Sequence, residues 1–195
     1  MLAVADPPAD PRTGAPELDA ARVRLAAAGD PDACRALVEL YQARVFALAS
    51  RMLVGRGRAT VEDCAQDTFL HVFRKLSTFD AGASAGAGGA KLSTWILTIA
   101  ARRAIDELRR ARPTLVADLD PEDPARATRR ELVAAIERAL AELSPPLRAA
   151  FLLREYHGLD YAEIARALDI DLGTVKSRLA RARAALRDQL AEVKP

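Results

Sequence analysis

Residues 161–190 read YAEIARALDIDLGTVKSRLARARAALRDQL and carry the clearest structural signal in the chain. Apolar residues recur at three- and four-residue spacing on both sides of the turn at residues 169–171, which predicts two helices joined by that turn. This arrangement is typical of a helix-turn-helix, which places its second helix in the major groove of DNA. The side chains expected to face inward are Ile164, Ala165, Leu168, Ile170, Val175 and Leu179.

The second of these helices is cationic, although the chain as a whole is nearly neutral. Residues 172–187 include basic side chains and no acidic one, so this helix offers positive charge to phosphates. Because forked guanidinium groups pair with guanine, we expect Arg178 and Arg181 to read bases, and Lys176 and Arg183 to hold phosphates. A solvated basic helix face is the alternative. The residues predicted to contact DNA in this unit are Tyr161, Gly173, Thr174, Lys176, Ser177, Arg178, Arg181 and Arg183.

The composition of the whole chain agrees with a helical fold. Its 195 residues are 50% hydrophobic and 29% charged, which suits one or two small globular domains and excludes a large enzyme. Aromatic residues make up only 5%, whereas alanine, leucine and arginine dominate, and these residues favour helices. With 29 basic and 27 acidic side chains the net charge is +2, so a nucleic-acid role must depend on where the charges lie. We therefore expect an all-α protein.

Breaks in the apolar periodicity divide the chain into two helical domains. Residues 1–15 are predicted to be a disordered leader, residues 16–112 a first domain and residues 128–190 a second. Between the domains, residues 113–127 (PTLVADLDPEDPARA) contain prolines and clustered acids, which predict an extended linker. Within the first domain, residues 81–90 (AGASAGAGGA) have no large side chain and are expected to form a flexible loop.

The expected helix starts depend on capping residues. After a short helix over residues 17–28, Asp30 and Pro31 are a suitable N-cap and first helical residue. The apolar stripe of the helix that follows is expected to comprise Leu37, Tyr41, Val45, Leu48 and Met52. Pairs that resemble capping boxes are expected to open three later helices: Thr60 with Asp63, Thr128 with Glu131, and Asp160 with Glu163.

Four stretches follow one another along residues 20–190 in an order that is itself informative. They are EDCAQDTFLHVFRKLSTFD, STWILTIAARRAIDELRR, the acidic linker, and LSPPLRAAFLLREYHGLDYAEIARALDIDLGTVKSRLARARAALR. In this order they resemble the extracytoplasmic-function (ECF) sigma factors of bacterial RNA polymerase. The resemblance implies a region 2 domain that binds core polymerase and opens the minus-ten promoter element, and a region 4 domain that reads the minus-thirty-five element. It implies no enzymatic activity and no cofactor. The implied partners are core RNA polymerase, through its β′ clamp and β subunit, promoter DNA and an anti-sigma factor.

The same resemblance assigns roles to residues of the first domain. Asp63, Gln66 and Asp67 match the family's core-binding motif Asp-x-x-Gln-Glu, with Asp67 in place of the glutamate, and they form a polar patch suited to basic clamp residues. Trp95 matches the tryptophan that begins the minus-ten helix, with a role in the hydrophobic core as the alternative. The arginines expected to lie along this helix toward phosphates are Arg102, Arg103, Arg109 and Arg110. Many members have asparagine where Arg102 stands, so the base preference at minus ten stays open.

Two other classes of function compete with this interpretation. A helical metal or redox sensor is one, because Asp63, Asp67 and His71 are spaced four apart on one predicted helix. The only other histidine, His157, belongs to the other domain, so no metal site is predicted. A stand-alone helix-turn-helix regulator is the second, and it would bind duplex DNA unaided, usually as a dimer. No catalytic site is expected, since the sequence has no phosphate-binding loop and no nucleophile with an adjacent base.

The sequence also bears on where the protein works. The start MLAVADPPAD lacks the basic region of a secretion signal, and no window approaches the roughly 20 apolar residues that a membrane span needs. We therefore expect a soluble, cytoplasmic protein. Cys34 and Cys64 fall among apolar neighbours and are expected to be buried thiols, with a redox pair as the alternative.

Overall fold

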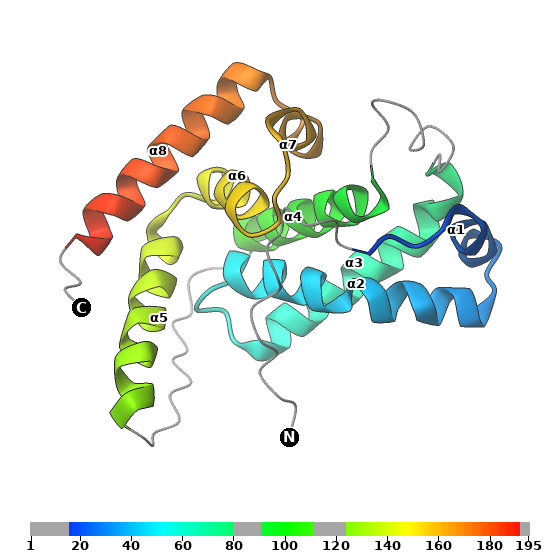
Figure 1. The fold of residues 1–195 in the computed structure, drawn as a ribbon, viewed down its shortest axis with the longest axis horizontal. Helices are drawn as coiled ribbons and strands as arrows, with labels where there is room; N and C mark the ends of the chain where they lie inside the picture. The colour runs from blue at the N-terminus through cyan, green and yellow to red at the C-terminus, as the bar shows by residue number, and fades with distance from the viewer. Residues whose placement is uncertain (1–15, 80–90, 111–123, 192–195) are drawn as a thin grey trace.

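The computed structural model describes residues 16–79, 91–110 and 124–191, and over these residues the chain is entirely helical. It contains eight α-helices and one short 3₁₀ helix in these ranges, which confirms the predicted all-α class. Figure 1 shows two groups of helices side by side, α1 to α4 and α5 to α8. The predicted leader, the glycine- and alanine-rich loop and most of the predicted linker lie outside the described residues.

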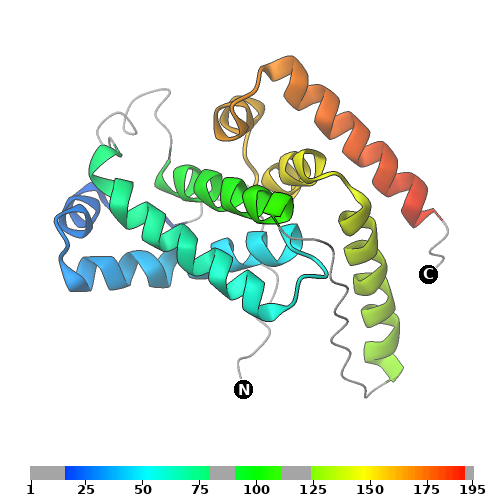
Figure 2. The ribbon, with the colours of Figure 1, turned by 180° about the vertical axis from the view of Figure 1, so that it is seen from behind.

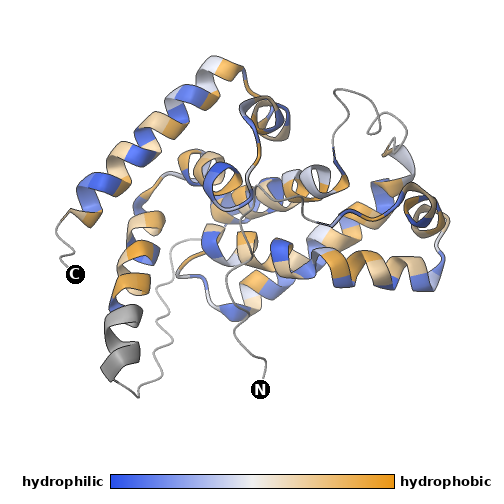
Figure 3. Cartoon of the chain, viewed as in Figure 1, coloured by the Kyte–Doolittle hydropathy of each residue, from blue (hydrophilic) through white to orange (hydrophobic). Residues whose placement is uncertain are grey.

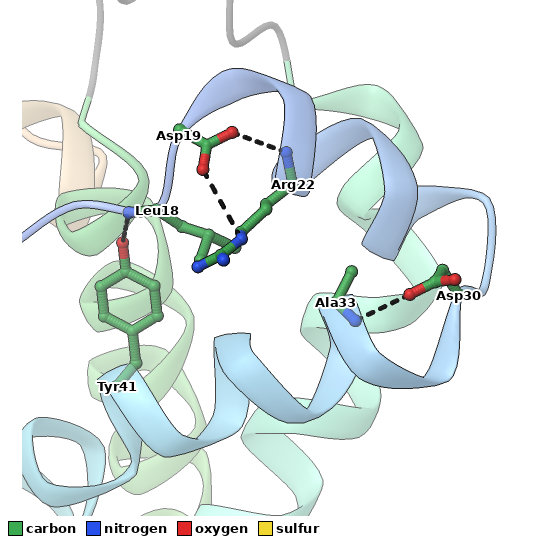
Figure 4. Close-up of polar contacts among 6 residues, drawn as sticks. All are labelled: Leu18, Asp19, Arg22, Asp30, Ala33 and Tyr41. Atoms are coloured by element: carbon green, nitrogen blue, oxygen red, sulfur yellow. Dashed lines mark hydrogen bonds and ion pairs between the residues drawn. The ribbon is translucent and has the colours of Figure 1, made fainter.

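The first group of helices begins where aspartate side chains cap the free N–H groups. Asp19 Oδ1 accepts from the Arg22 N–H at 2.9 Å, and Asp30 Oδ1 accepts from the Ala33 N–H at 2.8 Å (Figure 4). The predicted cap at Asp30, with Pro31 as the first helical residue, is therefore confirmed. The elements of this group are α1 (Ala20–Ala27), α2 (Pro31–Met52), α3 (Arg58–Lys75), the 3₁₀ helix η1 (Leu76–Thr78) and α4 (Leu92–Arg110).

The core of this group is built on the apolar stripe of α2, which packs against α3 and α4. All members of the predicted stripe are at most 1% exposed: Leu37, Tyr41, Val45, Leu48 and Met52. Burial raises the pKa of Tyr41 above its usual range, so its phenol stays protonated. The hydroxyl donates to Glu17 Oε2 at 3.0 Å and accepts from the Leu18 N–H at 3.1 Å, the second of which is drawn in Figure 4. The segment before α1 is thereby tied to α2.

Two of the expected helix starts are wrong. Helix α3 begins at Arg58, and its N-cap is Gly57, whose φ of 80° suits a residue without a side chain. Thr60 lies inside the helix, where its hydroxyl donates to the Arg56 carbonyl at 3.0 Å instead of capping. In the second group, α5 begins at Pro124, so Thr128 is not its N-cap.

The second group confirms the predicted helix-turn-helix. Asp160 and Glu163 form the expected capping box at the start of α7, and Asp169 ends that helix in the left-handed conformation at φ 54° and ψ 56°. Asp171 then caps α8 by accepting from the Thr174 N–H at 2.8 Å. The four helices are α5 (Pro124–Glu142), α6 (Pro145–Glu155), α7 (Tyr161–Leu168) and α8 (Leu172–Leu190). Figure 3 shows hydrophobic and hydrophilic residues alternating along α8, as in an amphipathic helix.

The two groups are packed against each other. Helix α4 contacts α6 and α7, and α2 contacts α5 and α6, so the contact involves two helices of the first group. Figure 2 shows the same arrangement from behind, with α4 running toward the second group. Arg148 of α6 is only 4% exposed at this boundary, and it donates to the carbonyl of Met52 at the end of α2.

Candidate functional site

The acidic face of α3 is determined by which side of the helix enters the core. Val61, Cys64 and Thr68 point inward and are at most 6% exposed, which leaves Asp63, Gln66 and Asp67 on the solvent side. Because these three residues are spaced three and one apart, they share one exposed face of the helix. The structure thus brings together all three residues that the sequence analysis predicted to bind polymerase.

A narrow polar groove of about 120 Å³ connects this face to α4. Asp63 and Asp67 line it from α3, while Arg103 and Arg110 line it from α4. Two residues expected to bind polymerase and two expected to approach promoter DNA therefore share one groove of mixed charge. Gln66 is not among the groove residues and is exposed on the outer side of α3.

One exposed apolar side chain on the same face was not predicted. Leu70 is 52% exposed, and it follows Gln66 by four residues and Asp67 by three, so it lies beside them on α3. The sequence contains a signal for the exposure of Leu70. The core residues Val61, Thr68 and Val72 share one face of the helix, and Leu70 lies on the opposite face. The face of α3 therefore combines two carboxylates, an amide and a leucine.

The start of α4 carries the predicted tryptophan. Trp95 is half-buried, packs on the hydrophobic core, and its ring lies 5.3 Å from that of Phe79 at an angle of 39°. It also lines a cleft of about 420 Å³ between α3, α4 and α7. Trp95 therefore has the core contacts that the alternative expected and, in addition, access to a cleft.

The predicted arginines of α4 have different surroundings. Arg102 donates to the Ala167 carbonyl of α7 at 2.9 Å, and Arg103 Nη2 lies 2.6 Å from His71 Nδ1. Burial and the neighbouring Arg103 lower the pKa of His71, which suits a neutral imidazole that accepts from the guanidinium. Arg109 pairs with Asp106 at 3.8 Å, and both Arg109 and Arg110 are exposed. Of this predicted set, Arg102 contacts α7 and Arg103 contacts α3, whereas the ion pair of Arg109 lies within α4 itself.

The predicted DNA-contacting face of α8 is largely open to solvent. Val175 and Leu179 are at most 1% exposed and hold the helix against α6 and α7. On the opposite side, the exposed residues are Gly173, Lys176, Ser177, Arg181 and Arg183, while Thr174 and Arg178 are partly exposed. The solvent side of α8 therefore carries basic side chains, and we refer to it as the basic face of this helix.

Two members of this predicted DNA-contacting set are held by neighbours. Arg183 forms an ion pair with Glu155 of α6 at 2.6 Å, and the hydrogen bond to Glu155 raises the pKa of Arg183. The ring of Tyr161 lies under the guanidinium of Arg154, 5.3 Å from its carbon to the ring centre. These contacts fix where the side chains of Arg183 on α8 and Tyr161 at the start of α7 lie.

The geometry does not favour a metal or redox site. Among residues 16–79, 91–110 and 124–191, no group of three or more histidine, cysteine, aspartate and glutamate side chains is placed to hold a metal ion. Cys34 and Cys64 are both free thiols. Burial raises the pKa of Cys64 to about 11, so this thiol is protonated at neutral pH and unreactive.

Comparisons with known proteins assign this architecture to a family. The model of sigma-70 region 2 matches residues 37–114, and that of sigma-70 region 4 matches residues 134–186. The chain is 29% identical over 191 residues to the ECF RNA polymerase sigma factor SigW of Bacillus subtilis, covering 88% of this chain and 96% of that protein. It is 34% identical over 170 residues to the ECF RNA polymerase sigma factor SigM of Mycobacterium tuberculosis, covering 86% and 82%. The chain belongs to the ECF sigma factors.

Among solved structures, it resembles CnrH in complex with the cytosolic domain of CnrY, with a TM-score of 0.65, 26% identity, and coverage of 88% of this chain and 96% of that one.

As an ECF sigma factor, the protein is a non-enzymatic specificity subunit, and the stand-alone regulator is excluded because both sigma regions match. The region 2 match begins within α2 and includes α3 and α4, and the region 4 match begins within α5, includes α6 and α7, and ends within α8. No helix in the described part of the chain is long and apolar enough to cross a membrane.

Proposed function

We propose that this sigma factor binds core RNA polymerase through the exposed face of α3. Asp63, Gln66 and Asp67 supply carboxylate and amide oxygens for basic side chains of the β′ clamp, and Leu70 supplies an apolar contact beside them. The observation that carries this assignment is the common exposed face of the three residues that match the family's core-binding motif. A charged rim around an apolar anchor is the usual composition of a specific protein interface.

We also propose that region 4 reads the minus-thirty-five element with the basic face of α8. Arg178 and Arg181 lie one turn apart, so both face one groove of DNA and can pair with base edges. Lys176 is positioned for phosphates, and Gly173 and Ser177 leave room for the close approach of a phosphate backbone. Arg183 forms an ion pair with Glu155, so its guanidinium can bind a DNA phosphate only when this ion pair opens.

The minus-ten element is assigned to α4. Trp95 lines the cleft and can stack on an unpaired base, while Arg103, Arg109 and Arg110 follow along the helix toward phosphates. A stacking aromatic followed by cations is the pattern by which proteins hold single-stranded DNA. This suits the opening of promoter DNA, in which polymerase itself performs the chemistry.

An anti-sigma factor is proposed as the regulator of the protein. The support comes from the family resemblance and from CnrH, whose structure contains the cytosolic domain of CnrY. Such a partner would cover the polymerase-binding face of α3. Adding the partner should then prevent the protein from binding core polymerase, and simultaneous binding of both would contradict this assignment.

The decisive experiment for the polymerase assignment is co-migration with bacterial core RNA polymerase on a sizing column. The double variant D63A/Q66A should lose binding, since it removes a carboxylate and an amide from one exposed face. The matched control is E39A/Q42A, which removes the same two chemical groups, three residues apart, from the exposed surface of α2. Equal binding by both double variants would show that the α3 face is not the polymerase contact.

A further inference from the structure

The start of α4 is held by a carboxylate from the beginning of the chain. Glu17 Oε2 accepts from the Ser93 N–H at 3.2 Å, and Glu17 Oε1 accepts from the Ser93 hydroxyl. Ser93 is the second residue of α4, and the N–H groups in the first turn of a helix have no acceptor within that helix. Glu17 therefore serves α4 as an N-cap residue would, although it lies 76 residues before Ser93 in the sequence.

The chemistry of Glu17 suits this position. The N-terminus of a helix carries the positive end of the helix dipole, so a carboxylate placed there stabilises the first turn. Ser93 is only 4% exposed, and a buried N–H group without an acceptor is costly. Glu17 itself lies at the surface, so its substitution should loosen the first turn of α4 and leave the core closed.

Helix α2 fixes the direction in which this carboxylate points. The Tyr41 hydroxyl donates to Glu17 Oε2 at 3.0 Å and accepts from the Leu18 N–H at 3.1 Å, the second of which is seen in Figure 4. Because Tyr41 is 1% exposed within the apolar stripe of α2, its hydroxyl is a fixed anchor for the segment before α1. Burial lowers the pKa of Arg44 on the same helix, and the nearby charge of Glu17 opposes this shift. The carboxylate is thus oriented by α2 and bound to α4.

The contact acts on the turn of helix that carries Trp95. Trp95 follows Ser93 by two residues, and its N–H donates to the Lys91 carbonyl at 3.0 Å, so both residues belong to the first turn of α4. The Trp95 ring packs on Phe79, which follows η1, and η1 in turn contacts α1. The chain in and before α1 therefore supports both the backbone of Trp95 and the ring on which it packs.

We propose that Glu17 is a positioning residue for Trp95, and that opening of the minus-ten element depends on it. The inference rests on the proposed function, in which Trp95 stacks on an unpaired base of that element. A binding side chain must be held within about 0.5 Å of its productive position, and hydrogen bonds behind it provide this accuracy. Glu17 precedes residues 37–114, which match the region 2 model, so the matched residues do not include it.

The fluorescence of Trp95 tests the positioning directly, because Trp95 is the only tryptophan in the chain. Glu17→Gln keeps the size of the side chain but replaces one carboxylate oxygen with an amino group that cannot accept a hydrogen bond. In the free, full-length protein this variant should shift the emission to longer wavelength, and acrylamide should quench it more strongly. The far-ultraviolet circular dichroism spectrum should not change. Unchanged emission and quenching would overturn the inference.

The matched control is Asp19→Asn, which also converts a carboxylate into an amide in the segment before α1. Asp19 caps α1 by accepting from the Arg22 N–H at 2.9 Å, so its substitution loosens α1 and leaves the contact between Glu17 and Ser93 in place. This control should keep the emission of the unmodified protein. Equal shifts in the two variants would mean that Trp95 responds to the N-terminal segment as a whole, which would overturn the role of Glu17.

Ser93→Ala tests the same contact from the side of α4. It removes the hydroxyl that donates to Glu17 and should by itself shift the emission of Trp95, so it decides the question even where Glu17→Gln fails to fold. If Glu17 acts through Ser93, the shift in the double variant should be smaller than the sum of the two single shifts. Strictly additive shifts would overturn this route from Glu17 to Trp95.

Promoter opening by the complex with core polymerase tests the functional consequence. A promoter that carries 2-aminopurine in its minus-ten element becomes more fluorescent as the strands part. Glu17→Gln should lower the equilibrium constant for opening about 10-fold, as expected for the loss of a hydrogen bond to a charged group. Binding of core polymerase should be unchanged, and Asp19→Asn should open the promoter normally.

Trp95→Ala in the same assay separates the inference from the proposed function. Normal opening by this variant would contradict the stacking role that the proposed function gives to Trp95. The emission of the free protein would then still decide whether Glu17 positions the ring. Normal opening by Glu17→Gln, combined with defective opening by Trp95→Ala, would overturn the inference and leave the proposed function intact.

Discussion

His157 provides a sharp prediction about the pH dependence of stability. Burial, together with the nearby positive charges of Arg44 and Arg51 on α2, lowers the pKa of His157 from 6.5 to about 3. Because the folded protein disfavours the charged imidazole, protonation favours the unfolded chain. The stability that neutral His157 contributes is therefore complete above pH 6.5 and is lost as the pH falls from 6.5 toward 3.

The size of the effect follows from the two pKa values. At pH 5 the unfolded imidazole is almost fully protonated and the folded one is neutral, so the free energy of unfolding is lower than at pH 7 by about 2 kcal/mol. The substitution His157→Gln removes the titrating group. The variant should lose much less stability than the unmodified protein over this pH interval.

Urea unfolding followed by circular dichroism at pH 7 and pH 5 provides the measurement. The chain has two histidines, so His71→Gln is a matched control that retains His157. This control should keep most of the pH dependence, because His71 is only partly buried. The reasoning fails if the unmodified protein and the His157→Gln variant lose equal stability between pH 7 and pH 5.

Three further predictions concern capping, promoter reading and polymerase binding. Asp160→Ala removes the side chain that accepts from the Glu163 N–H, and should lower the free energy of unfolding by about 1 kcal/mol in urea titrations; an unchanged midpoint would contradict the capping role. Arg178→Ala should weaken binding of the polymerase complex by about 1 to 3 kcal/mol at one base pair of the minus-thirty-five element, whereas equal weakening on every sequence would make it a phosphate contact. Leu70→Gln should lower the affinity for core polymerase about 10-fold and leave the thermal unfolding temperature unchanged. Unchanged affinity of this variant would show that Leu70 is not part of the interface.

The parts of the fold that were predicted correctly are those set by local sequence. The stripe of α2, the cap at Asp30 and the turn at residues 169–171 depend on side chains within a few residues of one another. The caps at Thr60 and Thr128 were wrong because the pattern of a hydroxyl three residues before an acid also occurs inside helices. Inside a helix the backbone N–H groups are already hydrogen-bonded to the helix itself. The first residue of the helix is determined instead by the position at which the preceding turn ends.

For the candidate site, the sequence predicts which residues share a helix face but not which contacts their side chains make. Spacing placed Asp63, Gln66 and Asp67 on one face, since helical geometry fixes that relation. Spacing carries no information about Arg102, whose partner Ala167 lies 65 residues away, or about Arg183, whose partner Glu155 lies on another helix. Such pairs arise only from the packing of α4 on α7 and of α6 on α8.

The contacts of Glu17 constrain how region 2 can be completed during synthesis. Its carboxylate accepts from the Ser93 N–H at 3.2 Å, and the two residues are 76 apart in sequence. At a translation rate of about 5 to 20 residues per second, Glu17 waits roughly 4 to 15 seconds before Ser93 is made, and longer before Ser93 leaves the ribosome. Helices α1 to α3 are therefore made while the start of α4 is missing, and Glu17 can meet Tyr41 of α2 well before its contact with Ser93 completes the domain.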